Sequence, residues 1–395
     1  MKTNKIFTIG SLLVFSFFVK YADATPVIVI KEYTYHAKEF DSQETSRAIA
    51  LEQVKRSLLE ELGTYLESDT EVENFQLTTD KITTLTAGIV QTKILQEKWN
   101  KPTYWLKAKI MADDQQVVKS IDALRKDRSK TKELEELKQR TDTQLQEIDR
   151  LRAELTVTKG IKKQDGLVAY NKAIKELKAS DWFLKGWGLQ NSGNHKDAIS
   201  AYNKAIELDP LYAMAYNMRG AAFASLGDFS QALRDHGKAI DLDPQYAAAF
   251  NNRGVAYCQL GNFGQAIKDF DSGIDLDSEF EAIYVNRGNA YYNLGNFTQA
   301  LKDFNNAIEL NPNNAATYSN RGNTYRDTGN FGPALNDFNR SIALNPNDAA
   351  AYWNRGALYG QQLGNYRQGE ADIKRAAQLG LRDAQDLLRR NRIRW

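Results

Sequence analysis

The residues of this chain best suited to chemistry are asparagines that recur at a fixed spacing. Asn252, Asn286, Asn320 and Asn354 follow one another every 34 residues. An amide side chain both donates and accepts hydrogen bonds, so a row of amides can bind the backbone of an extended peptide regardless of its sequence. Alternatively, these amides bond to neighbouring loops or helix ends. The remaining candidates for this polar surface are Asn217, Asn251, Asn289, Asn293 and Asn323, with Tyr292 and Arg326 as contacts for side chains of a ligand.

Other site chemistries have little support in the composition. The histidines, His36, His195 and His236, are far apart in sequence, and the single cysteine, Cys258, has no neighbouring base to activate it. The sequence contains no glycine-rich phosphate loop, nucleophile elbow or paired metal-ligand motif. Its 52 Lys and Arg against 50 Asp and Glu give a net charge of only +2, so the chain has no strong positive potential that would attract nucleic acid. We therefore expect a protein that is not an enzyme and that binds no cofactor, metal or nucleic acid.

A row of arginines repeats in step with a row of aspartates. The arginines are Arg219, Arg253, Arg287, Arg321 and Arg355, and the aspartates are Asp235, Asp269, Asp303, Asp337 and Asp372. Arginines alone would suit a phosphate or carboxylate ligand, but matched opposite charges in every repeat favour structural ion pairs.

The elements that carry these rows follow a 34-residue repeat. Its markers are Pro210, Pro244, Pro312 and Pro346, and Gly193, Gly227, Gly261, Gly295 and Gly329. One inserted residue near Gln361 and Gln362 moves the last turn glycine to Gly364. Each repeat predicts two helices joined by a turn, for example 282–292 and 298–310, because the second is apolar on one side and ends before a proline. A single pair of this kind cannot bury its apolar sides, so the repeats must stack.

These positions resemble the consensus of the tetratricopeptide-repeat family. One unit supplies Tyr318, Gly322, Tyr325, Ala334, Phe338, Ser341 and Pro346 at the consensus steps. Six units fit, at 179–212, 213–246, 247–280, 281–314, 315–348 and 349–382, with capping helices at 164–178 and 383–395. The resemblance implies a superhelix whose concave groove is lined by the first helix of each unit and binds an extended peptide or partner segment.

A different domain is predicted at residues 25–112. Val27 to Tyr35 indicates a strand, 42–67 a long helix, and 93–99 with 104–110 a hairpin of two alternating strands. This α+β domain resembles the small domain at the start of certain flagellar and envelope assembly lipoproteins, in its helix rich in small and apolar residues and in Gly88-Ile89-Val90.

The segment 113–163 is predicted to be a charged helical linker or a coiled coil. Counted to Asp165, it has 25 charged residues among 53, which is too polar for a globular core. Leu134, Leu137, Ile148, Leu151 and Leu155 occupy heptad a and d positions, with Thr141 and Gln144 as polar interruptions. If this seam over 134–155 pairs between chains, the protein is a homo-oligomer; if not, the helix is a stiff spacer.

The first 24 residues have the pattern of a signal peptide. Lys2 and Lys5 precede a 14-residue apolar run, 6–19, and Ala22-Asp23-Ala24 matches a cleavage site. The run is short of the ~20 residues that span a bilayer. The alternative is an uncut signal anchor. If the segment is cleaved, no stable membrane span remains and the protein is periplasmic or secreted.

Together these features predict a mostly α-helical, exported adaptor or scaffold. Its solenoid would bind a partner protein, and its N-terminal domain would dock it to an envelope assembly. One alternative is a carbohydrate-binding or enzyme-accessory protein of the envelope that uses Trp99, Trp105, Trp182 and Trp187 as stacking platforms. Another is a purely structural coiled-coil oligomer.

Overall fold

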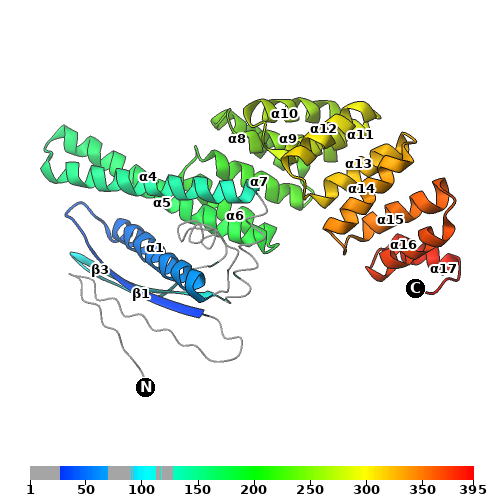
Figure 1. Ribbon diagram of the computed structural model, residues 1–395. Coiled ribbons are helices and arrows are strands. Elements are labelled where there is room, and N and C mark those ends of the chain that lie inside the picture. Colours follow the sequence, from blue (N-terminus) through cyan, green and yellow to red (C-terminus); the bar gives the residue numbers. More distant parts are fainter. Residues whose placement is uncertain (1–26, 70–89, 91, 113–116, 118–127) are drawn as a thin grey trace, which may run out of the picture. The chain divides into compact units, whose positions relative to one another are not determined.

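The computed structural model of the chain describes residues 27–69, 90, 92–112, 117 and 128–395 (Figure 1). They belong to two compact units, divided between Leu226 and Gly227. The predicted signal peptide lies outside the described residues. None of the helices in the described ranges is long and apolar enough to cross a membrane.

Three antiparallel strands form a sheet in the N-terminal unit, in the order β1-β3-β2. They are β1 (Val27–His36), β2 (Lys93–Asn100) and β3 (Thr103–Ala112). β2 and β3 form the predicted hairpin, with Asn100 opposite Thr103, and β1 pairs with the other edge of β3. Alternate residues of β3 from Tyr104 to Ala112 are buried, so one side of the sheet carries the core.

Helix α1 (Gln43–Asp69) packs against β1 and β3 (Figure 1). The Ser42 hydroxyl caps its start by accepting a hydrogen bond from the Thr45 N–H at 3.1 Å. Ala50, Val54, Leu58 and Leu62 recur every four residues and are buried. The α+β character predicted for this region is confirmed.

Helices α4 (Arg128–Val157) and α5 (Ile161–Asn191) pack side by side. The apolar residues of the heptad seam, Leu134, Leu137, Ile148, Leu151 and Leu155, are all buried in the same core as residues of α5. The polar interruption Gln144 accepts a hydrogen bond from the Ser180 hydroxyl of α5 at 3.1 Å. The seam therefore exists, but its partner lies in the same chain. This differs from the predicted spacer or intermolecular coiled coil, because the heptad pattern shows which side of the helix is covered but not by what.

Helix α5 is one continuous helix of 31 residues. The sequence analysis predicted a capping helix at 164–178 and a separate repeat starting at 179. The two segments instead form one helix, because no helix-breaking residue separates them. Its residues Tyr170, Leu177, Phe183 and Trp187 are buried throughout its length. It continues through a turn into α6 (His195–Leu208) and α7 (Ala213–Ser225).

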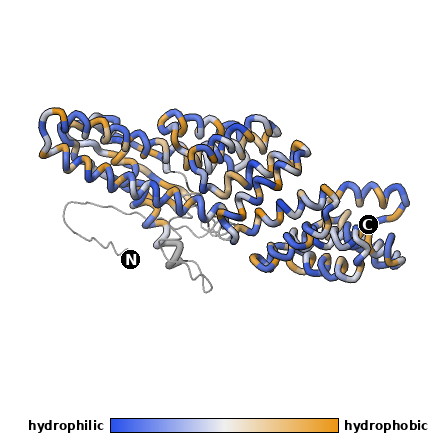
Figure 2. Tube along the Cα trace, turned by 90° about the horizontal axis from the view of Figure 1, so that it is seen from above, coloured by the Kyte–Doolittle hydropathy of each residue, from blue (hydrophilic) through white to orange (hydrophobic). Residues whose placement is uncertain are grey.

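The remaining helices belong to the C-terminal unit and confirm the helix-turn-helix repeat. We call the first helix of each repeat the A helix and the second the B helix. The A helices are α9 (Ala247–Gln259), α11 (Glu281–Asn293), α13 (Ala315–Asp327) and α15 (Ala349–Ala357). The B helices are α8 (Phe229–Leu242), α10 (Phe263–Leu276), α12 (Phe297–Leu310), α14 (Phe331–Leu344) and α16 (Tyr366–Gln378). Hydrophobic and hydrophilic residues alternate at short intervals along them (Figure 2), as in helices with one buried side.

Glycines serve two purposes in each repeat. Gly254 lets the A helix approach the B helix, since a Cβ there would lie 2.6 Å from the ring of Phe270. Gly295 ends an A helix with φ +73°, a conformation that other residues adopt at a cost.

The predicted arginine–aspartate pairs form in the C-terminal unit. Each arginine donates two hydrogen bonds of 2.7–2.8 Å to one buried aspartate, joining the A and B helices of a repeat. The pairs are Arg253–Asp269, Arg287–Asp303, Arg321–Asp337 and Arg355–Asp372. These arginines are structural, as the matched rows predicted.

The inserted residue near Gln361 widens the helix. Residues Leu358–Gln362 form a π-helical turn, η1, which accommodates the extra residue before the turn at Gly364. At the end of the chain, α17 (Arg382–Arg390) packs Ala384 and Leu388 against α16. The predicted cap at 383–395 is thus shorter than expected, because the helix stops before Asn391.

Candidate functional site

The A helices form one side of the C-terminal stack. α11 contacts both α9 and α13, whereas within residues 227–395 no two consecutive B helices contact each other to the same extent. Over α9, α11 and α13 the A helices therefore lie closer together than the B helices, so this part of the stack curves toward the A side. We call this side, from α9 to α15, the inner face.

At the first two A helices of the inner face, the predicted amides bond to one another. The Asn286 side chain donates to the Asn251 Oδ1 at 2.8 Å, which joins α11 to α9. The Asn251 side chain donates to the Asn252 Oδ1 at 3.3 Å, and Asn251 is only 7% exposed. For these residues the structure supports the alternative, in which the amides form hydrogen bonds with neighbouring side chains of the protein.

Farther along the stack, the amides are not used in this way. The side chains of Asn289, Asn320 and Asn354 are partly exposed and make no hydrogen bond to any other residue that the structure describes. The Oδ1 of Asn323 is buried and has no hydrogen-bond partner. We call these four residues the open amides. Their donors and acceptors remain available to a ligand.

The residue 35 positions earlier explains the difference between paired and open amides. Asn286 finds Asn251 there. Asn320 instead has Val285, which offers no acceptor, and Asn354 has Ser319, whose shorter side chain makes no hydrogen bond to it. Asn320 and Asn354 are therefore open because of substitutions in the repeat, not because of a change of fold.

The two predicted side-chain contacts, Tyr292 and Arg326, share one carboxylate. The Tyr292 hydroxyl donates to one oxygen of Asp327, and the Arg326 Nε donates to the other at 2.9 Å. Partial burial acts to raise the pKa of Asp327, but the hydrogen bonds from Arg326 and Tyr292 hold it below its usual value. The sequence prediction missed Asp327, although its place 35 residues after Tyr292 gives the same register as the amide pair. Asn293, beside them, donates to the backbone carbonyl of Asn289 at 2.7 Å.

Asn217 is the candidate that the structure moves out of the site. It lies on α7 in the N-terminal unit and has no exposed surface. Because its side chain is fully covered in this structure, Asn217 is not one of the open amides.

The four tryptophans do not gather into a stacking platform. Trp187 is buried and its indole N–H donates to Glu133 at 3.3 Å. Trp99 packs beside Tyr104 across the β2–β3 pair, whereas Trp105 follows Tyr104 in β3 and therefore points to the opposite side of the sheet. Trp182 lines a pocket together with residues of α1 and other residues of α5.

Two titratable groups of the C-terminal unit are poorly placed for catalysis. Burial, with a smaller effect of Arg253, lowers the pKa of His236 to about 3. Burial raises the pKa of the Cys258 thiol to about 11, which opposes formation of the nucleophilic thiolate. Among the described residues, no group of three or more His, Cys, Asp and Glu side chains is placed to hold a metal ion.

Comparison with known proteins identifies the repeat. A family model described as TPR repeat, the tetratricopeptide repeat, matches residues 191–227, 220–261, 256–295, 288–329 and 322–362. No curated protein sequence matches the chain.

Two solved structures similar to this chain, with TM-scores of 0.50 and 0.51, share its helical fold. PilW, a widely conserved type IV pilus biogenesis factor, is 18% identical with a TM-score of 0.50, over 53% of this chain and 98% of PilW. One chain of the APC/C hetero-tetramer Cut9–Hcn1 is 18% identical to this chain, with a TM-score of 0.51. The match covers 89% of this chain and 61% of the Cut9–Hcn1 chain. YrrB, a TPR protein with an unusual peptide-binding site, is 24% identical with a TM-score of 0.38, over 46% of this chain and 93% of YrrB. Residues 191–362 are thus tetratricopeptide repeats, and the helical array is a solenoid of that type.

Proposed function

We propose that the inner face binds an extended segment of a partner protein and that the chain is a non-enzymatic adaptor. The observation that supports this proposal is the row of open amides on successive A helices. A partly buried amide without a partner loses hydrogen bonds to water and gains none from the protein. A bound backbone would supply the missing donors and acceptors.

The spacing of packed helices suits an extended peptide. Neighbouring helices lie about 8–10 Å apart, and a polyproline II segment rises about 9 Å in its three-residue turn. Every third residue of such a segment would therefore present its backbone to the next A helix. Recognition through the backbone would be tolerant of sequence, and the cluster of Tyr292, Arg326 and Asp327 would add selectivity for a polar side chain.

The test is selection of peptides from a displayed random library on the full chain, followed by affinity measurement with synthetic peptides. The double variant Asn320→Ala and Asn354→Ala removes two hydrogen bonds of about 1 kcal/mol each, so we expect binding to weaken about thirtyfold. The matched control is Asn306→Ala with Asn336→Ala, two asparagines of B helices that make no side-chain hydrogen bond in the described chain. Equal affinities of both double variants would refute the proposal.

A second variant tests the register of the amides. Val285→Asn places an amide 35 residues before Asn320, as Asn251 stands before Asn286. The introduced amide should form a hydrogen bond with Asn320 and so compete with the peptide for that side chain, while all four open amides remain in place. We expect weaker peptide binding with an unchanged circular dichroism spectrum, and tighter binding would contradict the assigned roles.

In this proposal the adaptor is exported and its N-terminal unit docks it to an envelope assembly. The support is the sequence pattern of residues 1–24 and the α+β character of the region that follows. Cell fractionation and N-terminal sequencing of the native protein test this step. A mature chain starting near Thr25 in the exported fraction is expected, and a full-length cytosolic chain would refute it.

A further inference from the structure

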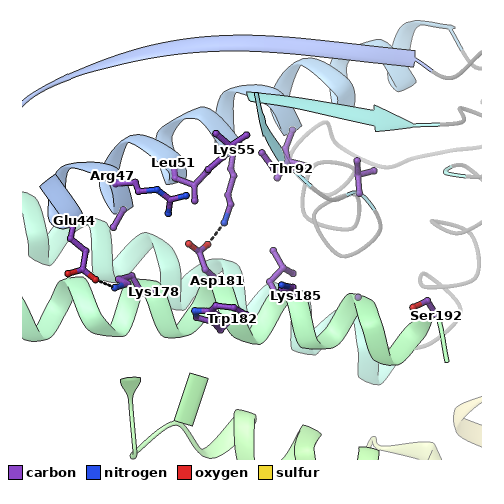
Figure 3. A pocket seen from close by; sticks show the side chains of 16 residues that line it. Glu44, Arg47, Leu51, Lys55, Thr92, Lys178, Asp181, Trp182, Lys185 and Ser192 are labelled. Atoms are coloured by element: carbon purple, nitrogen blue, oxygen red, sulfur yellow. Dashed lines mark hydrogen bonds and ion pairs between the residues drawn. The ribbon is translucent and has the colours of Figure 1, made fainter. Parts of the chain in front are cut away.

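A pocket separate from the inner face lies in the N-terminal unit, between α1 and α5 (Figure 3). Its volume is about 830 Å³, within the range of roughly 300–1,000 Å³ typical of small-molecule sites. Four residues of α5 line it, at successive intervals of three, one and three residues, and therefore from one side of the helix: Lys178, Asp181, Trp182 and Lys185. Residues of α1 from Glu44 to Leu59 form the opposite wall.

Three of the four cationic side chains in the wall are already paired with carboxylates. The pairs are Lys178 with Glu44, Lys55 with Asp181, and Arg47 with Glu97, the last at 2.8 Å. These pairs neutralise most of the local charge and join α1 to α5 and to the sheet.

Lys185 differs from the other three. It is exposed, and no carboxylate of the described chain pairs with it. Its ammonium group lies 4.7 Å from the centre of the Trp182 ring. This cation–π contact holds the ammonium at the pocket wall but leaves its hydrogen-bond donors unused.

The rest of the wall is largely apolar. Leu51 and Leu59 of α1, Ile94 of β2 and Leu184 of α5 line it together with Val90. Except for the buried Val90, these side chains are partly exposed, so a ligand could bury more of their apolar surface.

We propose that this pocket binds a small amphipathic carboxylate. Its apolar chain would lie against the leucines and Trp182, and its carboxylate would accept hydrogen bonds from Lys185. A single negative charge fits because Lys185 is the one cation of the described wall without a carboxylate partner. A neutral apolar ligand would leave the Lys185 donors unused, and a multiply charged anion would meet only one available cation.

Isothermal titration calorimetry of the full chain with decanoate, below its micelle concentration, tests the proposal. Octanoate should bind about fifteenfold more weakly, because each buried methylene contributes about fourfold in affinity. Lys185→Gln should weaken decanoate binding about tenfold through loss of a charge-assisted hydrogen bond. Lys162→Gln is the matched control, since Lys162 is an exposed lysine of the same helix that does not line the pocket.

Decyltrimethylammonium, with the same chain and the opposite charge, tests the role of charge. It should bind much more weakly than decanoate. Equal binding of the two, no binding of decanoate, or an unchanged affinity in Lys185→Gln would each overturn the proposal. None of these results bears on peptide binding at the inner face, because Lys185 and the open amides belong to different units.

Discussion

A buried carboxylate, Asp41, connects the N-terminal sheet to the long helices of the same unit. It accepts hydrogen bonds from the Tyr35 hydroxyl of β1 at 2.9 Å, the Tyr170 hydroxyl of α5 at 2.5 Å and the Lys38 N–H at 2.7 Å. Arg152 of α4 lies 3.8 Å away. β1 with the loop that follows it, α4 and α5 therefore meet at one side chain. We predict that Asp41→Ala opens the sheet, α4 and α5 together.

The magnitude follows from the two hydroxyls. Tyr35 is 3% exposed and Tyr170 is fully buried, so neither hydroxyl has water as a substitute partner. A buried donor left without a partner costs about 1–3 kcal/mol, so the pair costs about 2–6 kcal/mol. The Lys38 N–H belongs to an exposed residue and can bond to water, so it adds little.

Hydrogen exchange measured by mass spectrometry on the full chain reports this loss segment by segment. A loss of about 2–6 kcal/mol should speed exchange in β1 and α5 by about thirtyfold to 25,000-fold. Glu39→Ala, at an exposed carboxylate two residues away, should leave exchange unchanged. If Asp41→Ala speeds exchange in β1 but not in α5, the sheet and the helices open independently and the reasoning fails.

Three further predictions concern the repeats. Gly288→Ala places a Cβ 2.8 Å from the Phe304 ring, and chemical denaturation should show a loss of about 1–3 kcal/mol. Arg287→Gln leaves the carboxylate of Asp303, which is 2% exposed, without its ion pair, and should lower the free energy of unfolding by about 3–5 kcal/mol. For His236, the folded pKa of about 3 lies below the ordinary 6.5, so the unfolded chain takes up the proton first and stability falls as the pH drops from about 6.5 toward 3. His236→Phe, the residue found at this position in the next three repeats, should remove that dependence in unfolding curves recorded across this range.

Control variants distinguish the effects of close packing and of a buried ion pair from a nonspecific loss of stability. Gly264→Ala adds a methyl group to a helix where nothing lies within 4 Å, so it should stabilise the protein by about 0.5–1 kcal/mol. Arg326→Gln breaks a partly exposed pair with Asp327 and should cost less than about 1 kcal/mol. A loss in Gly264→Ala equal to that in Gly288→Ala, or equal losses in the two arginine variants, would contradict the role given to close packing and burial. A pH dependence retained in His236→Phe would place the acid-sensitive group elsewhere.

The repeats were predictable because their local signals agree. Prolines and turn glycines mark the ends of helices such as α12, and the spacing of apolar residues gives the buried side. The same signals fail at α5, where the sequence lacks a breaker and two predicted elements merge into one helix. For α4 the heptad pattern identified the buried stripe but not its partner, since periodicity shows which side of a helix is covered and never by what.

The candidate site was also predictable only in part, and a comparison between repeats would have improved the prediction. A period of 34 places Asn286, Asn320 and Asn354 in one row, but it does not tell which of them is already bonded. In a stack, the decisive contact is between repeats, and here it joins residues 35 apart, as in Asn286 with Asn251. For this row, comparing each amide with the residue 35 positions earlier distinguishes the paired amide from the open ones by sequence alone. The same comparison would have found Asp327 as the partner of Tyr292. In this row of the solenoid, therefore, the amides that stay open for the proposed ligand, Asn320 and Asn354, are those whose partner position in the preceding repeat holds an apolar or shorter side chain.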